Sequence, residues 1–490
     1  MINPQIAKLS FLAQEATRKN IFWWLIFLCI ICGFLHVAIG SDSLIPLLAI
    51  TAIMMGVVPV ANFGVVNIGA VLVFLVAFRY VGVSLFAKLF FGQALDTNLE
   101  NPLCAFLAVA VGVAAYFIGF ISVNRMNVGL PLLRSITHHG LLRRISYYSF
   151  LIGFVSNLEC ALRVSSSIPV WNISSAFMPF LHLSLISAAA SSITRSDERR
   201  IFDVWVVVVL AVEIIFSFIQ NSRAMIVEVF LALILTDIAF RGKITKKQIT
   251  SAIIAILLLI IITPVFLVVR NFREDLGWKE RIFFTMQVFT RLDEANDSYS
   301  KYLYMLDAEA LTGKFYLNYY EMPNNLLERV SLVNNTDLFM DGANSIGYVK
   351  FEVIGRAIKF ALPRFFVPDK PVDYSEGDWL HYYYTGEYRY GNFLSSPLVG
   401  VGYVSFGWVG VFVFPLFISI IMFLIIKKAT GLDIQNNVWA IFILASINNT
   451  FVEGGFQGNM AVILRVLPQE IIVMMIISIF IGINKVHIFK

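Results

Sequence analysis

The sequence predicts an all-α protein that crosses a membrane many times, and composition, apolar runs and charge placement lead to this prediction. Of the 490 residues, 58% are hydrophobic and only 14% are charged, whereas globular proteins carry roughly 25% charged residues. This shortage of charge excludes a soluble enzyme, a disordered chain and a collagen-like chain.

Twelve apolar runs come close to the length of about 20 residues that a helix needs to cross the hydrocarbon layer. They cover residues 21–39, 44–61, 63–79, 103–123, 145–165, 168–194, 201–219, 224–240, 248–270, 400–426, 437–453 and 460–483. The residues before the first run are expected to be a cytoplasmic leader to an uncleaved helix. We therefore expect helices 1–9 in residues 1–270, a loop layer in 271–399, and helices 10–12 in 400–490.

Basic residues alternate between the connections, which predicts the orientation. Connections on the side of the N-terminus, together with both ends of the chain, carry 18 Lys and Arg residues. The short connections on the other side carry three, namely Arg79, Lys88 and Arg223. Because positive residues collect on the cytoplasmic side, both termini are expected in the cytoplasm.

The connection 271–399 is the one long segment without a spanning run. It contains 13 basic and 18 acidic residues and is too long for a structureless loop in a compact protein. We expect a folded, partly helical layer outside the cytoplasm. Its amphipathic stretches predict helices over 280–306 and 345–362, and the second suits a helix lying along the membrane surface.

Several arginines lie at or near the outer ends of the predicted spans, where lysine is nearly absent: Arg163, Arg223, Arg270 and Arg465. The planar guanidinium group matches phosphate oxygens better than the point charge of lysine does. Arg163 can instead pair with Glu159, one turn away. Arg465 lies within a span and has no acid four residues away, so the pattern favours a site for a lipid pyrophosphate head group.

The aromatic segment 378–390 contains further candidates. Trp379 and Tyr383 suit the apolar faces of sugar rings, but tryptophan and tyrosine also collect at membrane interfaces. His381, the only histidine of the large loop, titrates near neutral pH or has a structural role. Glu453, at the outer end of the eleventh run, is either the counter-ion of Arg465 or a proton acceptor.

The order of these features resembles a known family. Asn221-Ser222-Arg223-Ala224 opens a span, Arg270 ends the next, and Thr290-Arg291 follows in a loop helix. Then come a proline-rich run from Pro363 to Pro371 that includes Lys370, a Ser-Pro and glycine-rich entry to the next helix, and finally Glu453 and Arg465. Over about residues 200–480 this pattern resembles the Wzy-type oligosaccharide repeat-unit (O-antigen) polymerases.

The resemblance implies a glycosyltransferase that joins undecaprenyl-pyrophosphate-linked repeat units at the periplasmic face of the bacterial inner membrane. The expected substrate-binding residues are Arg223, Arg270, Arg273, Arg291, Arg465, Lys370, Trp379 and Tyr383. The expected candidates for the catalytic base are Glu453, His381 and Asp378. The expected partners are lipid-linked donor and acceptor glycans, the bilayer and a chain-length regulator, with no nucleic acid.

We expect no metal and no cofactor. Cys29 and Cys32 have the C-x-x-C spacing of zinc sites, but no nearby residue completes such a site. Arginines aimed at the leaving pyrophosphate could instead stabilise its growing charge.

Two alternative functions remain open. An O-antigen ligase would use the same donor with a different acceptor. A flippase or other transporter of lipid-linked oligosaccharide would fit twelve spans equally well, and Glu213, Glu228 and Asp237 within predicted spans favour it. The large outer loop and the absence of a detectable sequence repeat argue against the transporter.

Overall fold

The protein is all-helical in the part of the chain that the computed structural model describes. This part covers residues 23–163, 177–220, 222–242, 278–291, 330–362, 375–386 and 395–482, with a few single residues or pairs between them. No β-strand occurs among these residues. Five of the described helices are long and apolar enough to cross a membrane: Leu44–Phe63, Ile68–Phe90, Pro102–Arg125, Leu398–Ala429 and Gly455–Phe480. The predicted class, an α-helical membrane protein, agrees with this architecture.

The chain divides into two compact units, and each is described by itself. The first unit comprises Met1–Asn127, Leu306–Ile425 and Asn448–Leu464, and the second comprises Val128–Met305, Ile426–Ile447 and Arg465–Lys490. Both are assembled from segments that are distant in the sequence. The division expected from the sequence, with boundaries at residues 270 and 399, separates predicted membrane spans from the predicted loop layer. It stays a prediction.

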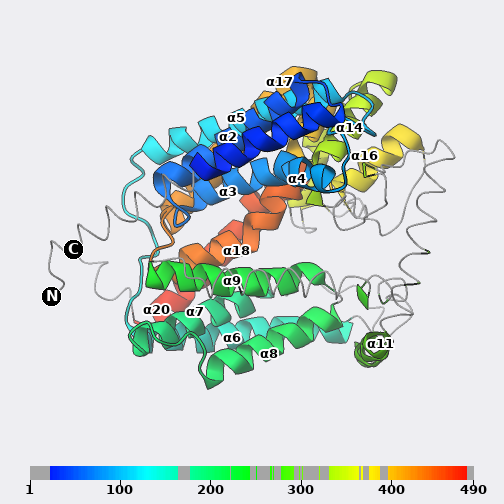
Figure 1. Ribbon diagram of the computed structural model, residues 1–490. Helices are drawn as coiled ribbons and strands as arrows, with labels where there is room; N and C mark the ends of the chain where they lie inside the picture. Colours follow the sequence, from blue (N-terminus) through cyan, green and yellow to red (C-terminus); the bar gives the residue numbers. More distant parts are fainter. Residues whose placement is uncertain are drawn as a thin grey trace. The chain divides into compact units, whose positions relative to one another are not determined.

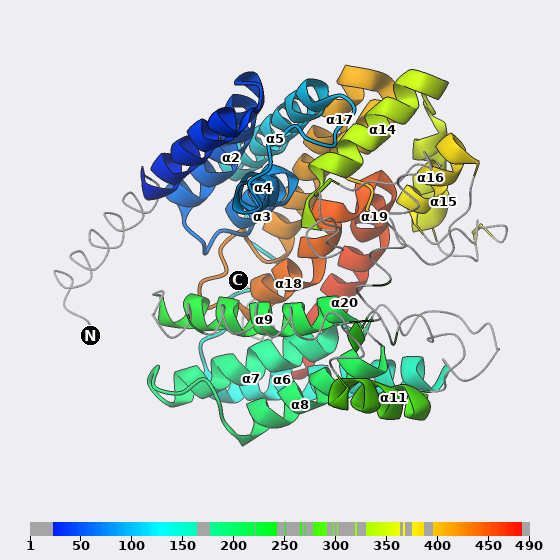
Figure 2. The ribbon, with the colours of Figure 1, turned by 45° about the vertical axis from the view of Figure 1, so that its right-hand side comes forward.

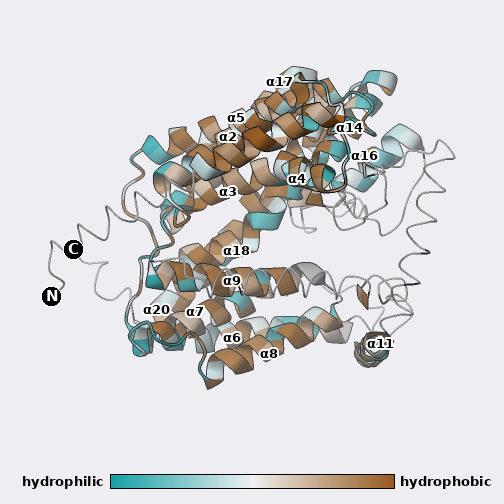
Figure 3. Cartoon of the chain, in the orientation of Figure 1, coloured by the Kyte–Doolittle hydropathy of each residue, from teal (hydrophilic) through white to brown (hydrophobic). Residues whose placement is uncertain are grey.

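The first unit begins with a bundle of apolar helices. A helix over Trp23–Ile39 precedes α2 (Leu44–Phe63), α3 (Ile68–Ala77), the π-helical turn η1 (Phe78–Gly82), α4 (Val83–Phe90) and α5 (Pro102–Arg125). The helices α2, α3 and α5 pack side by side (Figure 1) and are predominantly apolar (Figure 3). Small residues permit this close packing, since a Cβ atom at Gly56 would collide with Ala77.

The third predicted span, 63–79, is shifted in the structure. Gly64 ends α2 with a φ of 79°, and the side chain of Asn67 caps α3 by accepting a hydrogen bond from the N–H of Ala70 at 3.1 Å. The helical segment that follows continues from Ile68 to Phe90 through η1. The run chosen from hydropathy therefore started before the cap and stopped too early.

The tenth predicted span, 400–426, contains a break. The helix α17 (Leu398–Ala429) has non-helical backbone angles at Phe406 and Gly407, and Gly407 has a φ of 59°. Gly402 and Gly410 lie against each other across this break, because a Cβ atom on either would collide with the backbone of the other. The glycines of the glycine-rich entry to this span therefore bring together the two segments of α17 on either side of the break.

Three short helices of the first unit belong to the predicted loop layer: α14 (Val333–Ile346), α15 (Glu352–Ala361) and α16 (Glu376–Thr385). Figure 2 shows α15 and α16 beside α19 (Gly455–Ala461), against which both pack. The predicted helix 345–362 is right in its end and in its amphipathic character, since Val353, Ala357 and Ala361 form a buried face. Its start is wrong because Gly347, with a φ of 120°, separates α14 from α15.

The second unit is built around a buried central helix. It contains α6 (His139–Arg163), α7 (Phe180–Arg195), α8 (Val204–Ile219), α9 (Arg223–Arg241), α11 (Trp278–Thr290) and α20 (Leu467–Phe480). The helix α7 is buried from Phe180 to Ile193 and packs against α6, α8 and α9, which lie alongside it in Figure 1. Asp203 and Ser222 cap α8 and α9, so these helices begin close to the predicted positions.

Other predicted elements of this unit are described only in part. The sixth predicted span, 168–194, is described from residue 177 onward, and most of the ninth, 248–270, lies outside the described residues. Of the predicted helix 280–306, α11 covers the first part and ends at Thr290. Its apolar side, with Val288 and Phe289, packs against Val265 and Val269.

Candidate functional site

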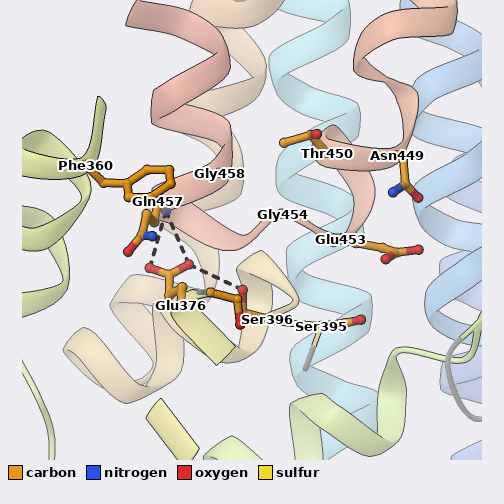
Figure 4. Close-up of a pocket in the computed structure, with 11 residues that line it drawn as sticks. Phe360, Glu376, Ser395, Ser396, Asn449, Thr450, Glu453, Gly454, Gln457 and Gly458 are labelled. Carbon is orange, nitrogen blue, oxygen red and sulfur yellow. Dashed lines mark hydrogen bonds between the residues drawn. The ribbon is translucent and has the colours of Figure 1, made fainter. Parts of the chain in front are cut away.

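A polar pocket of about 230 Å³ lies in the first unit, where α18 (Val438–Glu453) ends and α19 begins. The residues that line it come from four separate parts of the unit (Figure 4): Phe360, Ser375, Glu376, Ser395, Ser396, Asn449, Thr450, Glu453, Gly454, Gln457 and Gly458. Polar side chains thus converge on a site within an otherwise apolar bundle, which is typical of a ligand pocket.

The local sequence explains why the chain opens here. Gly454 and Gly455 follow the apolar helix α18 and reverse the chain direction, and Gly455 has a φ of 56°. A Cβ atom at Gly455 would collide with the carboxylate of Glu376. Glycine is therefore required both for the backbone conformation and for the approach of this carboxylate.

Glu376 is the most buried acid of the pocket, with 4% of its surface exposed. It begins α16, whose first turn is capped by Ser375, and its two carboxylate oxygens accept hydrogen bonds from the N–H of Gln457 at 3.3 and 3.2 Å. The hydroxyl of Ser396 donates to the same group at 3.5 Å. Burial raises the pKa of Glu376 to about 8, although these hydrogen bonds and the charge of Arg356 act in the opposite direction. This carboxyl therefore exchanges its proton near neutral pH.

Glu453, one of the predicted catalytic residues, also lines the pocket. Its side chain extends away from Glu376 (Figure 4) and forms an ion pair with Arg79. Arg79 also donates hydrogen bonds to the side chain of Asn449 and to the carbonyl of Val330, both at 3.3 Å. The sequence suggested Arg465 as the counter-ion of Glu453, and the structure assigns this role to Arg79 because the π-helical turn η1 presents its side chain there.

The remaining candidates on α16 are not part of the pocket lining. Asp378, Trp379 and His381 are buried, and the ring of Trp379 lies 4.2 Å from the guanidinium group of Arg356. Nδ1 of His381 lies 3.4 Å from the hydroxyl of Thr385. Tyr383 is 41% exposed and so remains able to contact a ligand. Asp378 and His381 share a helix with Glu376, but only Glu376 reaches the pocket.

The predicted cationic residues are described only in part. Arg465 is half-buried in the π-helical turn η3 (Val462–Val466), and Arg291 is exposed directly after α11. Arg223 begins α9, but its side chain is not among those described, and Arg270, Arg273 and Lys370 lie outside the described residues. Arg79 and Arg465 both lie in π-helical turns within apolar helices, a feature that is frequent at functional sites. The shared arginine site stays a prediction.

Sequence reasoning missed four residues of this site: Arg79, Glu376, Asn449 and Gln457. A signal was present for the last two, since they belong to a run of polar residues that interrupts apolar sequence between Asn448 and Asn459. Arg79 was counted only as a charge in an outer connection. Glu376 lies in the first turn of α16, where acids are common, so its residue type alone gives no signal.

Among the described residues, no group of three or more His, Cys, Asp or Glu side chains is arranged to hold a metal ion. Comparison with protein-family models, with curated proteins and with solved structures finds no match to this chain.

Proposed function

We propose that the protein is a polymerase that joins undecaprenyl-pyrophosphate-linked oligosaccharide repeat units. The observation that carries this proposal is the carboxyl of Glu376, which exchanges its proton near neutral pH and lines an open polar pocket. The ordered resemblance to Wzy-type polymerases over about residues 200–480 supports the substrate class.

The proposal includes a topology. The chain crosses the bacterial inner membrane twelve times with both termini in the cytoplasm, and residues 271–399 form a periplasmic layer. On this topology α14, α15 and α16 and the turn at Glu453 lie on the periplasmic side. A lipid-linked donor and a lipid-linked acceptor can then meet at the pocket.

Glycosyl transfer needs a base for the acceptor and stabilisation of the leaving group. A hydroxyl of the acceptor sugar attacks C1 of the donor, the new C1–O bond forms, and the bond from C1 to the pyrophosphate oxygen breaks. The carboxylate of Glu376 takes the hydroxyl proton, which is efficient because its pKa lies close to the working pH. Glu376 thereby takes the role for which Glu453, His381 and Asp378 were candidates.

The other polar residues position the substrates. The side chains of Asn449, Gln457 and Ser395 line the pocket and offer hydrogen-bond partners to sugar hydroxyls. Glu453 pairs with Arg79, and the same arginine donates a hydrogen bond to Asn449 and keeps it in place. Arg223, Arg270, Arg273, Arg291, Arg465 and Lys370 remain the cations that the sequence predicts for binding the departing pyrophosphate.

The experiment that tests this proposal is the analysis of surface polysaccharide in a deletion strain carrying plasmid-borne variants. The deletion is expected to leave lipid A core with a single repeat unit. Glu376→Gln is expected to give the same pattern at normal protein abundance, because loss of a general base lowers a rate by roughly 10²–10⁴-fold. The control Glu352→Gln changes an exposed acid at the start of α15 and is expected to restore long chains.

Two results would contradict the proposal. A deletion strain with no repeat unit on the core indicates a ligase or a flippase. Long chains in the Glu376→Gln strain exclude Glu376 as the base.

A transporter of lipid-linked oligosaccharide is the second candidate, and one observation favours it. Glu213 and Glu228, two of the acids within predicted spans, flank the buried His182, as proton-coupled transporters would require. The third acid, Asp237, pairs with Arg241 on the same helix at 2.7 Å and does not add to this group.

A further inference from the structure

The second unit contains a cluster of ionisable side chains that the proposed function does not use. His182 on α7 lies between two carboxylates, with its Nδ1 3.2 Å from Oε1 of Glu213 on α8 and its Nε2 3.4 Å from Oε2 of Glu228 on α9. Glu470 on α20 is fully buried, accepts a hydrogen bond from the hydroxyl of Ser446 at 3.0 Å, and interacts electrostatically with His182. Four helices therefore bring one imidazole and three carboxyl groups together.

The charges of this cluster do not balance. Even with a protonated imidazole, three ionised carboxylates would leave a net charge of −2 in an apolar interior. Burying an uncompensated charge costs several kcal/mol, so a buried acid takes up a proton or a counter-ion instead. The cluster must therefore hold protons or a cation.

Two neighbouring arginines are already paired with other acids. On the helices packed against α7, Arg143 pairs with Asp203 at 2.8 Å, and Arg241 pairs with Asp237. Arg195 is at the far end of α7, thirteen residues from His182 and thus about 20 Å away along the helix. The other charged residues on these helices are Arg144, Glu159, Arg163 and Arg223, with Arg465 preceding α20. The charged groups that act on His182 are Glu213 and Glu228, and the charged group that acts on Glu470 is His182, so these partners all belong to the cluster.

Two carboxylate oxygens of the cluster are also unsatisfied. Oε2 of Glu213 and Oε1 of Glu470 are buried and have no hydrogen-bond partner among the described residues. Buried polar atoms of this kind require an explanation, and a bound proton removes the charge that makes them costly. Glu228, whose side chain is 22% exposed, offers a route by which protons reach the buried members.

We propose that His182, Glu213, Glu228 and Glu470 form an exchangeable proton-binding site within the helical core of the second unit. The imidazolium bridges Glu213 and Glu228, and Glu470 carries a proton of its own. Release of this proton places an additional negative charge beside α7 and loosens the packing of α20 in the unit. The inference does not rest on the proposed function, because it concerns a different set of residues.

The proposal is tested by infrared difference spectroscopy of the full-length protein in lipid nanodiscs, between mildly acidic and mildly alkaline solution. All variants are built on Glu376→Gln, so that the pocket carboxyl makes no contribution to the spectra. We expect a carbonyl stretching band of protonated carboxylic acid that shifts in D₂O. Glu470→Gln is expected to remove its main component, and His182→Gln is expected to shift its titration midpoint.

The matched control is Asp237→Asn, which changes a carboxylate that already has an arginine partner and is expected to leave the band unchanged. The proposal is wrong if no carboxylic acid band appears in the Glu376→Gln background, or if the band persists equally in Glu470→Gln and Glu213→Gln. A band that sodium ions abolish at constant pH would instead show a cation site and would also overturn it. None of these outcomes affects the polymerase test, which is read from cellular polysaccharide.

Discussion

At the scale of single residues, the chemistry of the pocket depends on one buried acid. The carboxylate of Glu376 accepts hydrogen bonds from backbone N–H groups at the start of α19, and these bonds favour the ionised form. Its removal from water favours the neutral form more strongly. The balance leaves a carboxyl whose proton is exchangeable near pH 8. Perturbed acids in a polar pocket are typical of catalytic sites.

The raised pKa of Glu376 predicts how stability depends on pH. The folded protein binds this proton more tightly than the unfolded chain, so the stabilisation is complete below about pH 4.5 and is lost as the pH rises through about 8. A tenfold change in proton affinity corresponds to about 1.4 kcal/mol, so the loss is on the order of a few kcal/mol. Burial also raises the pKa of Asp337, to about 6. The contribution of Glu376 is therefore measured above pH 6.

The measurement is the midpoint of thermal unfolding of the purified full-length protein between about pH 6 and pH 8. Glu376→Gln is expected to make the decrease in this range less steep, because glutamine does not titrate, while the acid cluster of the second unit keeps its own contribution. Glu352→Gln, at an exposed position, is expected to retain it. An equally steep decrease in Glu376→Gln would show that another group is responsible.

At the scale of elements, a short helix holds the start of a long apolar helix. The carboxylate of Asp337 on α14 accepts hydrogen bonds from the N–H groups of Glu100 and Asn101 at 2.7 and 3.0 Å, directly before α5 begins. These N–H groups would otherwise lack partners at a helix start. The carbonyl of Arg79 accepts a hydrogen bond from the N–H of Leu332 at 3.1 Å, which attaches η1 to the same segment.

The break in α17 gives a prediction for this element. Gly410→Ala is expected to destabilise the protein by about 1–3 kcal/mol, because the added methyl group collides with the backbone of Gly402. The neighbouring Val409→Ala changes a side chain that is 68% exposed and serves as the control. Thermal unfolding midpoints and the amount of protein inserted in the membrane measure the effect. Equal midpoints for the two variants would mean that the two segments do not approach as closely as described.

At the scale of the whole molecule, the expected topology is open to a direct test. Fusions of alkaline phosphatase, which is active only in the periplasm, are expected to be active after Ile346 and after Thr385. Alkaline phosphatase fused after Gly242 or after Gly431 is expected to be inactive. A reporter that is active only in the cytoplasm is expected to be active at these two positions. The basic residues Lys427 and Lys428 close to Gly431 are the reason why we expect this end in the cytoplasm. Active phosphatase after Gly431 would reverse the orientation.

Much of the helical architecture could be predicted from local sequence. Apolar runs predict where helices lie, and Asn67, Asp203, Ser222 and Ser375 mark where they begin, because capping depends on residues within one turn. The same runs do not predict π-helical turns or the break at Gly407. These features depend on contacts with residues elsewhere in the chain.

The sequence by itself determined that this is an all-helical protein with helices long and apolar enough to cross a membrane, since burial in lipid demands such helices whatever their neighbours are. The polar layer outside the cytoplasm stays a prediction. The sequence also singled out Glu453 as a functional candidate. Only the tertiary structure decided that Arg79 is the partner of Glu453, that Glu376 rather than Asp378 or His381 lines the pocket, and that His182 gathers three carboxyl groups. The reason is that ion pairing and desolvation depend on distance in space, and helix packing brings together residues that lie hundreds of positions apart.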